Sequence, residues 1–103
     1  MWIVLIDRDK ILFFLRNNKV RFAQDFKVVR IGVFGSFARN EATETSDIDL
    51  LVEFEPSTSN LSDKKAALKA LVEKEFNRRV DVCREKYIKS YYRNNILNSV
   101  VYA

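Results

Sequence analysis

Two apolar runs, and the polar residues that separate them, constrain the fold of this chain more than any other feature. The first run, Val28 to Phe34, is rich in β-branched residues and ends at Gly35-Ser36. The second run, Ile48 to Phe54, directly follows Asp47 and contains Asp49. Both runs have the length and composition of buried strands. The sequence therefore predicts two core strands, the first from Lys27 to Phe34 and the second from Ile48 to Phe54, with a turn at Gly35-Ser36 after the first and two acids at the start of the second.

The spacing of Asp47 and Asp49 predicts a cation site. Residues two apart on a strand project from the same face, with Cα atoms about 7 Å apart, so both carboxylates can converge on one ion. Gly35 and Ser36 stand where a strand gives way to a helix, and backbone N–H groups at a helix start favour phosphate. Together these residues suit a metal-bound nucleoside triphosphate.

The rest of the chain predicts helices that alternate with strands. Helical periodicity runs from Asp9 to about Phe26, with a weak point at Asn17-Asn18, and again from Leu61 to Phe76 after the loop Pro56–Asn60. A third strand is predicted at Arg79–Cys83, with Val80 and Val82 on one face and Asp81 on the other. Shorter helices are predicted at Ser36–Glu41 and within Tyr87–Tyr102, where Ile88, Tyr91, Tyr92, Ile96 and Leu97 are the apolar positions. This order predicts an α/β (α+β) fold, a small mixed sheet with helices packed over it.

Length and composition bound the function. With 103 residues, 48% of them hydrophobic and 31% charged, the chain is expected to form a single domain over residues 1–103. Histidine is absent and Cys83 is the only cysteine, which excludes an intrachain disulfide, a Cys/His zinc site and a Ser-His or Cys-His nucleophile pair. The apolar start, Trp2–Ile6, meets charged residues too soon for a signal peptide or a membrane span, so a cytoplasmic protein is expected.

Charge is segregated along the chain. Residues 1–40 carry a net +5, residues 41–55 carry −6, and residues 61–103 carry +5. Basic flanks of this kind permit attraction for nucleotide phosphates, RNA or an acidic protein partner, although a mildly cationic soluble surface explains them equally. Charge alone does not decide between these interpretations.

Carboxylates are enough for phosphoryl-transfer chemistry. Mg²⁺ prefers oxygen ligands, and Asp47, Asp49 and Asp81 could together hold two ions about 4 Å apart if Asp81 lies on the neighbouring strand. An acceptor hydroxyl would then attack the α-phosphorus of a nucleoside triphosphate and release pyrophosphate. Alternatively, Asp81 is a surface residue paired with Arg78 or Arg79. Arg39 either touches phosphate or ties down the following loop by pairing with an acid.

Three motifs carry a resemblance to a known family: Gly35-Ser36-Phe37-Ala38-Arg39, Ser46-Asp47-Ile48-Asp49-Leu50-Leu51-Val52 and Val80-Asp81-Val82. The chain resembles the minimal nucleotidyltransferases of the DNA polymerase beta superfamily over nearly its whole length. It most resembles the MNT-domain antitoxins of bacteria and archaea, which are encoded beside HEPN-domain toxins.

The resemblance implies a polymerase-beta-like fold in which Gly35 and Ser36 hold the triphosphate, with Arg39 beside them. It implies that Asp47 and Asp49 bind a pair of Mg²⁺ ions, that Asp81 completes the triad, and that AMP passes from ATP to a tyrosine of a partner HEPN toxin in a hetero-oligomer. Asn40 is a departure, since the family usually has glycine there. Asparagine tolerates the left-handed conformation that glycine would supply.

Two other functions stay open. The chain could neutralise its partner by occlusion alone, or it could transfer a nucleotide to RNA or to a small molecule. Cys83 is expected to be a buried small hydrophobe. The four glutamates around the second strand are expected to be solvated, namely Glu41, Glu44, Glu53 and Glu55.

Overall fold

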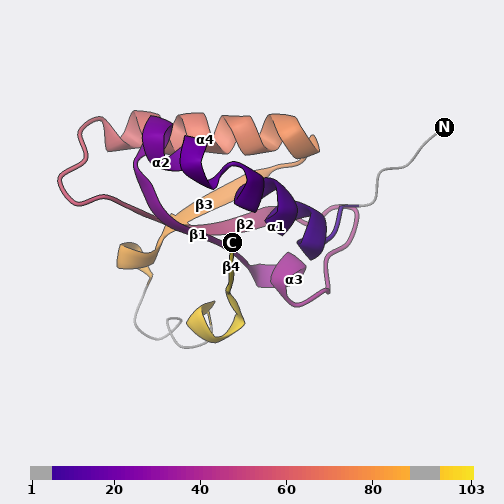
Figure 1. Cartoon of the computed structure of the whole chain (residues 1–103). Helices are drawn as coiled ribbons and strands as arrows, with labels where there is room; N and C mark the ends of the chain where they lie inside the picture. Colours follow the sequence, from indigo (N-terminus) through magenta and orange to yellow (C-terminus); the bar gives the residue numbers. More distant parts are fainter. Residues whose placement is uncertain (1–5, 89–95) are drawn as a thin grey trace.

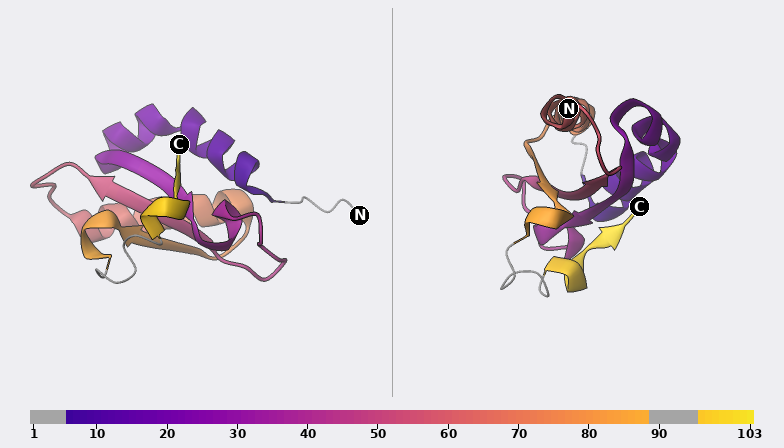
Figure 2. Two further views of the ribbon diagram at one scale, coloured as in Figure 1. Left: turned by 90° about the horizontal axis from the view of Figure 1, so that it is seen from below. Right: turned by 90° about the vertical axis from the view of Figure 1, so that its left-hand side faces the viewer.

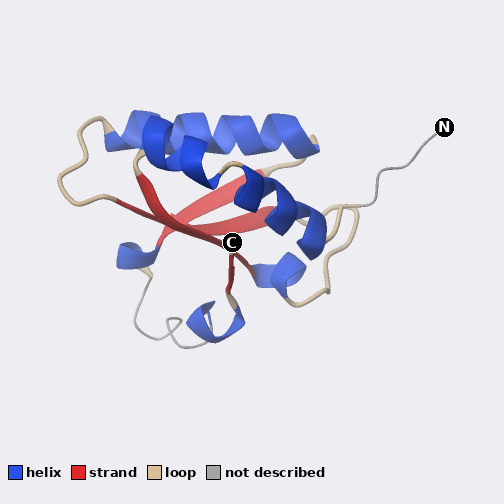
Figure 3. Cartoon of the chain, viewed as in Figure 1, coloured by secondary structure: helices blue, strands red, loops and turns tan. Residues whose placement is uncertain are grey.

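The protein is described by a computed structural model over residues 6–88 and 96–103 (Figure 1). The helices are α1 (Arg8–Asn17), α2 (Lys19–Phe26), α3 (Gly35–Ala38) and α4 (Leu61–Phe76), and Glu85–Tyr87 forms a 3₁₀ turn, η1. The strands are β1 (Val28–Phe34), β2 (Ile48–Phe54), β3 (Val80–Arg84) and β4 (Val101–Tyr102). Residues 96–99 form a further helical turn. Figure 3 distinguishes these helices and strands by colour.

The sheet is mixed, as the sequence predicts. Its strand order is β3-β2-β1-β4. Strand β2 is antiparallel to β1 and parallel to β3, and β4 is antiparallel to β1. The parallel pair is joined through α4, the crossover helix that a parallel connection requires.

The main core lies between the sheet and the helices α1, α2 and α4, which cover one face (Figures 1 and 2). Alternation along β2 sends Ile48, Leu50 and Val52 into this core, all three at 1% exposure or less. Asp49 and Leu51 therefore project from the opposite face. The turn of residues 96–99 lies on the other side of the sheet from α4 (Figure 2). The acids of β2 thus stand on the face that the long helices leave open.

Local signals explain the helix ends. Asp7 caps α1 by accepting a hydrogen bond from the Lys10 N–H at 2.8 Å. The predicted weak point is a real break, because Asn18 separates α1 from α2 and its side chain donates to the Phe14 carbonyl at 2.8 Å. Lys27 ends α2 in the left-handed conformation, with φ of 61°.

The predicted ends of β2 and α4 are confirmed. Strand β1 ends at Phe34 as predicted but begins at Val28, because Lys27 ends α2. Helix α3 is shorter than the predicted Ser36–Glu41, because the backbone leaves the helical region at Asn40, where φ is +58°. Strand β3 is displaced by one residue from the predicted Arg79–Cys83.

The tail differs more from its prediction. A helix was predicted within Tyr87–Tyr102, and the residues Tyr91 and Tyr92 of that prediction lie outside the described residues. The described part contains the turn 96–99 and then the strand β4, which the sequence did not predict. A Cβ on Gly32 would lie 2.8 Å from the Val101 carbonyl oxygen, so glycine is what allows β4 to approach β1 this closely. Among the described residues, no helix has the length and apolar character needed to cross a membrane.

Candidate active site

The turn after β1 is built around a glycine that has a specific neighbour. Gly35 has φ of +73°, a conformation that costs an L-residue about 1–2 kcal/mol. A Cβ at this position would clash with the Asp49 carboxylate and would lie 3.0 Å from its carboxyl carbon. Phe34 and Asp49 are register partners across β1 and β2, which explains why the turn and the acid meet.

The three predicted aspartates converge at the start of the two parallel strands. Asp49 and Asp81 are register partners in β2 and β3, and parallel partners project from the same face. Asp49 is half-buried, whereas Asp47 and Asp81 are exposed. Burial raises the pKa of Asp49 to about 6, with further increases from the negative charges of Asp81 and Asp47, while Arg39 opposes the shift. The charges of Asp47 and Asp81 therefore both act on Asp49.

The donor set fits a hard divalent cation. Carboxylate oxygens are the ligands that Mg²⁺ prefers, and one or two of them suffice when substrate phosphates complete the coordination. Within the ranges 6–88 and 96–103, no three Asp, Glu, Cys or His side chains are gathered closely enough to hold one ion by themselves. The negative charges of Asp47 and Asp81 disfavour the ionised form of Asp49, and a cation with a triphosphate would offset this repulsion.

Arg39 follows one of its two predicted alternatives. Its Nε lies 3.1 Å from the Glu41 Oε2, so it pairs with an acid of the loop that follows α3. Its side chain remains half-exposed and still acts electrostatically on Asp49. The left-handed φ of +58° at Asn40 agrees with the expectation that asparagine can replace glycine there.

Asp81 has neither of its proposed arginine partners. Arg78 instead donates from Nη1 to the carbonyl oxygens of Thr43 and Ser46, at 2.9 and 3.2 Å. Arg79 is exposed, and no ion pair joins it to Asp81 among the described residues. The proposed pairing of Asp81 with Arg78 or Arg79 is therefore wrong, although Asp81 is exposed as that interpretation expects.

Two further expectations need correction. Cys83 is only half-buried, and its Sγ lies 3.8 Å from the Asp81 Oδ2, on the acidic face of β3 rather than in the core. The sequence did contain a signal for this position, because residues two apart on a strand, such as Asp81 and Cys83, share a face. Glu53 is not solvated, because its Oε1 accepts from the Arg84 Nη2 at 3.1 Å. The expectation of exposure holds for Glu41, Glu44 and Glu55.

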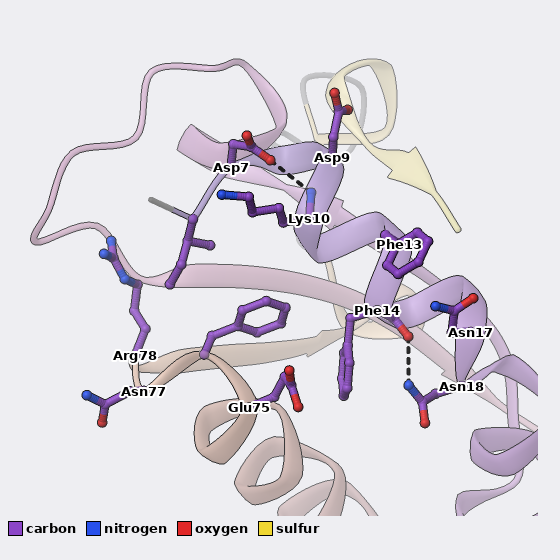
Figure 4. Close-up of a pocket in the computed structure, with 12 residues that line it drawn as sticks. Asp7, Asp9, Lys10, Phe13, Phe14, Asn17, Asn18, Glu75, Asn77 and Arg78 are labelled. Carbon is purple, nitrogen blue, oxygen red and sulfur yellow. Dashed lines mark hydrogen bonds between the residues drawn. The ribbon is translucent and has the colours of Figure 1, made fainter. Parts of the chain in front are cut away.

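A groove of about 990 Å³ lies elsewhere, between α1 and the C-terminal end of α4 (Figure 4). Phe14 points from α1 toward α4, where its ring meets that of Phe76 with centroids 5.4 Å apart. Phe13, at the rim, is 68% exposed. Neither Gly35 nor any of the three aspartates lines this groove, so it is separate from the acidic site.

Comparison with known proteins agrees with this geometry. The family model described as "nucleotidyltransferase domain" matches residues 15–103. The protein adenylyltransferase MntA of Thermococcus cleftensis is 36% identical over 95% of this chain and 97% of its own length. A solved structure of a candidate minimal nucleotidyltransferase is 32% identical, covers 93% of this chain and 95% of that one, and superposes with a TM-score of 0.75.

A more distant structure shares the fold. It is the tri-AMPylated HEPN toxin of Shewanella oneidensis in complex with its MNT antitoxin, matched at 16% identity over 88% of this chain and 70% of that one, with a TM-score of 0.58.

The mixed sheet and these matches place the chain among the enzymes of nucleotidyl transfer. The chain belongs to the nucleotidyltransferase domain family, as a minimal member of the polymerase beta superfamily.

Proposed function

We propose that this chain is a Mg²⁺-dependent protein adenylyltransferase that transfers AMP from ATP to a tyrosine hydroxyl of a partner HEPN-domain toxin and thereby acts as its antitoxin. The observation that carries the proposal is the position of Asp49, half-buried between Asp47 and Asp81 and in contact range of the Gly35 turn. The adenylyltransferase name of the Thermococcus relative and the AMPylated toxin in the distant complex support the choice of AMP and of a protein acceptor.

We assign triphosphate binding and metal binding to different residues of the site. The backbone N–H groups of Gly35 and Ser36, with the Ser36 hydroxyl, would bind oxygens of the triphosphate. Asp47, Asp49 and Asp81 would hold Mg²⁺, which when bound polarises the phosphate and lowers the pKa of the acceptor hydroxyl. Asp49 would have to be ionised for this, and a nearby cation lowers the pKa of a carboxyl.

The transfer step is a single displacement at phosphorus. Asp81 would accept the proton of the acceptor hydroxyl, whose oxygen forms the new bond to the α-phosphorus. The bond from the α-phosphorus to the bridging oxygen breaks, and pyrophosphate leaves with the electron pair. Such chemistry asks the protein for position and charge rather than for a nucleophile of its own, which suits a chain without histidine.

The proposal extends to partner and location. A hetero-oligomer with the toxin, formed in the cytoplasm where ATP is available, would bring the acceptor to Asp81. A protein acceptor suits the site, because Asp47 and Asp81 are exposed and none of the three aspartates lines the groove of Figure 4.

The decisive experiment incubates the chain with ATP, Mg²⁺ and the protein encoded beside it, then measures the mass of that partner and maps the modified residue. We expect the added mass of one or more AMP groups on tyrosine. An unchanged partner mass would remove the AMP-transfer proposal. Lengthening of RNA in the presence of labelled nucleoside triphosphates would instead favour a nucleic-acid acceptor.

Neutralisation by occlusion is the second candidate, and the groove with its exposed Phe13 is the observation that favours it. An Asp47→Asn/Asp49→Asn double variant separates the two functions. If that variant still neutralises the partner, binding alone is sufficient.

A further inference from the structure

Arg78 makes contacts that no part of the proposed chemistry uses. It follows α4 and precedes β3, and its side chain is only partly exposed. Its Nη1 donates to the Thr43 carbonyl at 2.9 Å and to the Ser46 carbonyl at 3.2 Å. Its guanidinium carbon lies 5.5 Å from the centroid of the Phe37 ring, which is 2% exposed. One side chain therefore connects α3 with the loop that precedes β2.

The two residues next to Asp47 in the chain each form a hydrogen bond, Ser46 with Arg78 and Ile48 with Arg79. On one side, the Ser46 carbonyl accepts from the Arg78 side chain. On the other side, the Ile48 N–H donates to the Arg79 carbonyl at 2.9 Å. The Asp47 side chain is exposed and Ile48 is buried in the core, so these two hydrogen bonds add to core packing in fixing the backbone on both sides of Asp47.

The same side chain also touches the turn that would hold phosphate. Phe37 directly follows Ser36, and its ring is covered by the Arg78 guanidinium. We propose that Arg78 is a positioning residue that sets the distance between the Gly35-Ser36 turn and the Asp47 carboxylate, and so governs metal binding together with a nucleotide. This inference rests on the proposed function, since it assigns Arg78 to the same metal–nucleotide site.

The contacts of Arg78 distinguish positioning from direct phosphate binding. Its Nη1 already donates to two carbonyl oxygens, and one face of its guanidinium lies over an aromatic ring. Arginine suits this role because its planar, delocalised group can stack and donate at once, whereas a lysine ammonium is a point charge. A lysine should therefore keep the charge and part of the hydrogen bonding but lose the stacking.

The test measures metal binding by the isolated chain, without any partner. Mn²⁺ is titrated by electron paramagnetic resonance in the presence of the non-hydrolysable ATP analogue AMP-PNP, and the analogue alone is titrated by calorimetry. For Arg78→Gln we expect Mn²⁺ affinity to fall about 10- to 100-fold, the usual range for residues that orient metal ligands. Affinity for the metal-free analogue should change less than the affinity for Mn²⁺, because Gly35 and Ser36 remain.

Arg79→Gln is the matched control, since it removes the same charge one residue away and keeps the backbone carbonyl that holds Ile48. It should bind Mn²⁺ within about two-fold of the original chain. Arg78→Lys should fall between the two glutamine variants, and it carries the test if Arg78→Gln does not fold.

Equal Mn²⁺ affinities in the original chain and in a folded Arg78→Gln variant would overturn the inference. So would an equal loss in Arg79→Gln, which would mean that net charge rather than geometry matters. If the original chain shows no Mn²⁺-dependent binding of AMP-PNP, the proposed function fails first.

Discussion

Gly35 and Asp49 approach each other so closely that a Cβ on Gly35 would lie 3.0 Å from the Asp49 carboxyl carbon. The turn after β1 and the acid on β2 therefore form one unit, although 13 residues separate them in the sequence. A side chain at position 35 must displace either the turn after β1 or the Asp49 carboxylate.

Gly35→Ala should therefore impair both stability and binding. We expect a loss of about 1–2 kcal/mol in the free energy of unfolding from the left-handed φ alone. Displacement of Asp49 by even 1 Å should slow nucleotidyl transfer by about 100-fold. Chemical denaturation and calorimetric titration of Mg²⁺ with AMP-PNP measure the two effects.

Gly32→Ala is the comparison for this variant. Gly32 lies on β1, the strand that leads into Gly35, but its added Cβ would meet Val101 rather than a site residue. This variant should lose stability while its folded molecules still bind the analogue. If Gly35→Ala binds as well as Gly32→Ala does, the Gly35 turn is not part of the nucleotide site.

Removing the charge of Asp49 should stabilise the protein and abolish its activity. The raised pKa of Asp49 shows that burial, Asp81 and Asp47 disfavour its ionised form, so Asp49→Asn relieves an unfavourable interaction in the metal-free protein. We expect a gain of about 1 kcal/mol near pH 7, a value reduced because the half-exposed carboxylate is screened by solvent. AMP transfer should be lost, because Asp49 is a proposed ligand of the metal.

Glu44→Gln provides the control for Asp49→Asn, because Glu44 is an exposed carboxylate of the preceding loop. It should leave both the melting temperature and the transfer rate nearly unchanged. An Asp49→Asn variant with full transfer activity would refute the assignment of Asp49 as a metal ligand.

The pKa of about 6 at Asp49 also sets a pH dependence. The folded protein binds a proton at Asp49 more tightly than the unfolded chain does, so the contribution of this group to stability increases as pH falls from about 7 toward 4. Metal binding follows the opposite course, since it needs the ionised carboxylate. Mg²⁺ affinity should fall as pH is lowered through about 6, and this fall should be weaker in Asp49→Asn.

Two measurements on one sample check both signs. Without metal, the melting temperature of Asp49→Asn should exceed that of the original chain at pH 7, and this difference should shrink at pH 5, where Asp49 is protonated. Calorimetry on the original chain should show weaker Mg²⁺ binding at pH 5 than at pH 7. If lowering the pH from 7 to 5 reduces both the stability and the metal affinity of the original chain, but not those of the variant, the raised pKa of Asp49 is contradicted.

The parts of the fold that the sequence predicts are those with a clear period and clear ends. Strand β2 lies between Asp47 and Pro56, and α4 begins after the loop that Pro56 opens, so both were predicted at their observed bounds. Strand β4 has only two residues and pairs with Gly32 from the far end of the chain. No local pattern encodes a contact of that kind.

The same distinction applies to the site. Asp47 and Asp49 follow from a period of two, and Asp81 follows once β3 is placed beside β2. The positioning role proposed for Arg78 could not be predicted in this way, because a side chain that binds carbonyl oxygens of a distant loop leaves no periodic signal. Cys83 was misplaced because its apolar neighbours suggested the core, although alternation along β3 puts it on the face of Asp81.

Cys83 offers a direct test of where Asp81 lies. Burial raises the pKa of the Cys83 thiol, and the negative charges of Asp81 and Asp49 raise it further, while Lys65 opposes the shift. Alkylation requires the thiolate, so iodoacetamide should react slowly at neutral pH. Asp81→Asn should accelerate the reaction several-fold, whereas Asp63→Asn, an exposed substitution on α4, should not. Because Cys83 is the only cysteine, the mass of the whole protein measures the rate, and equal rates in the two variants would place Asp81 away from the thiol.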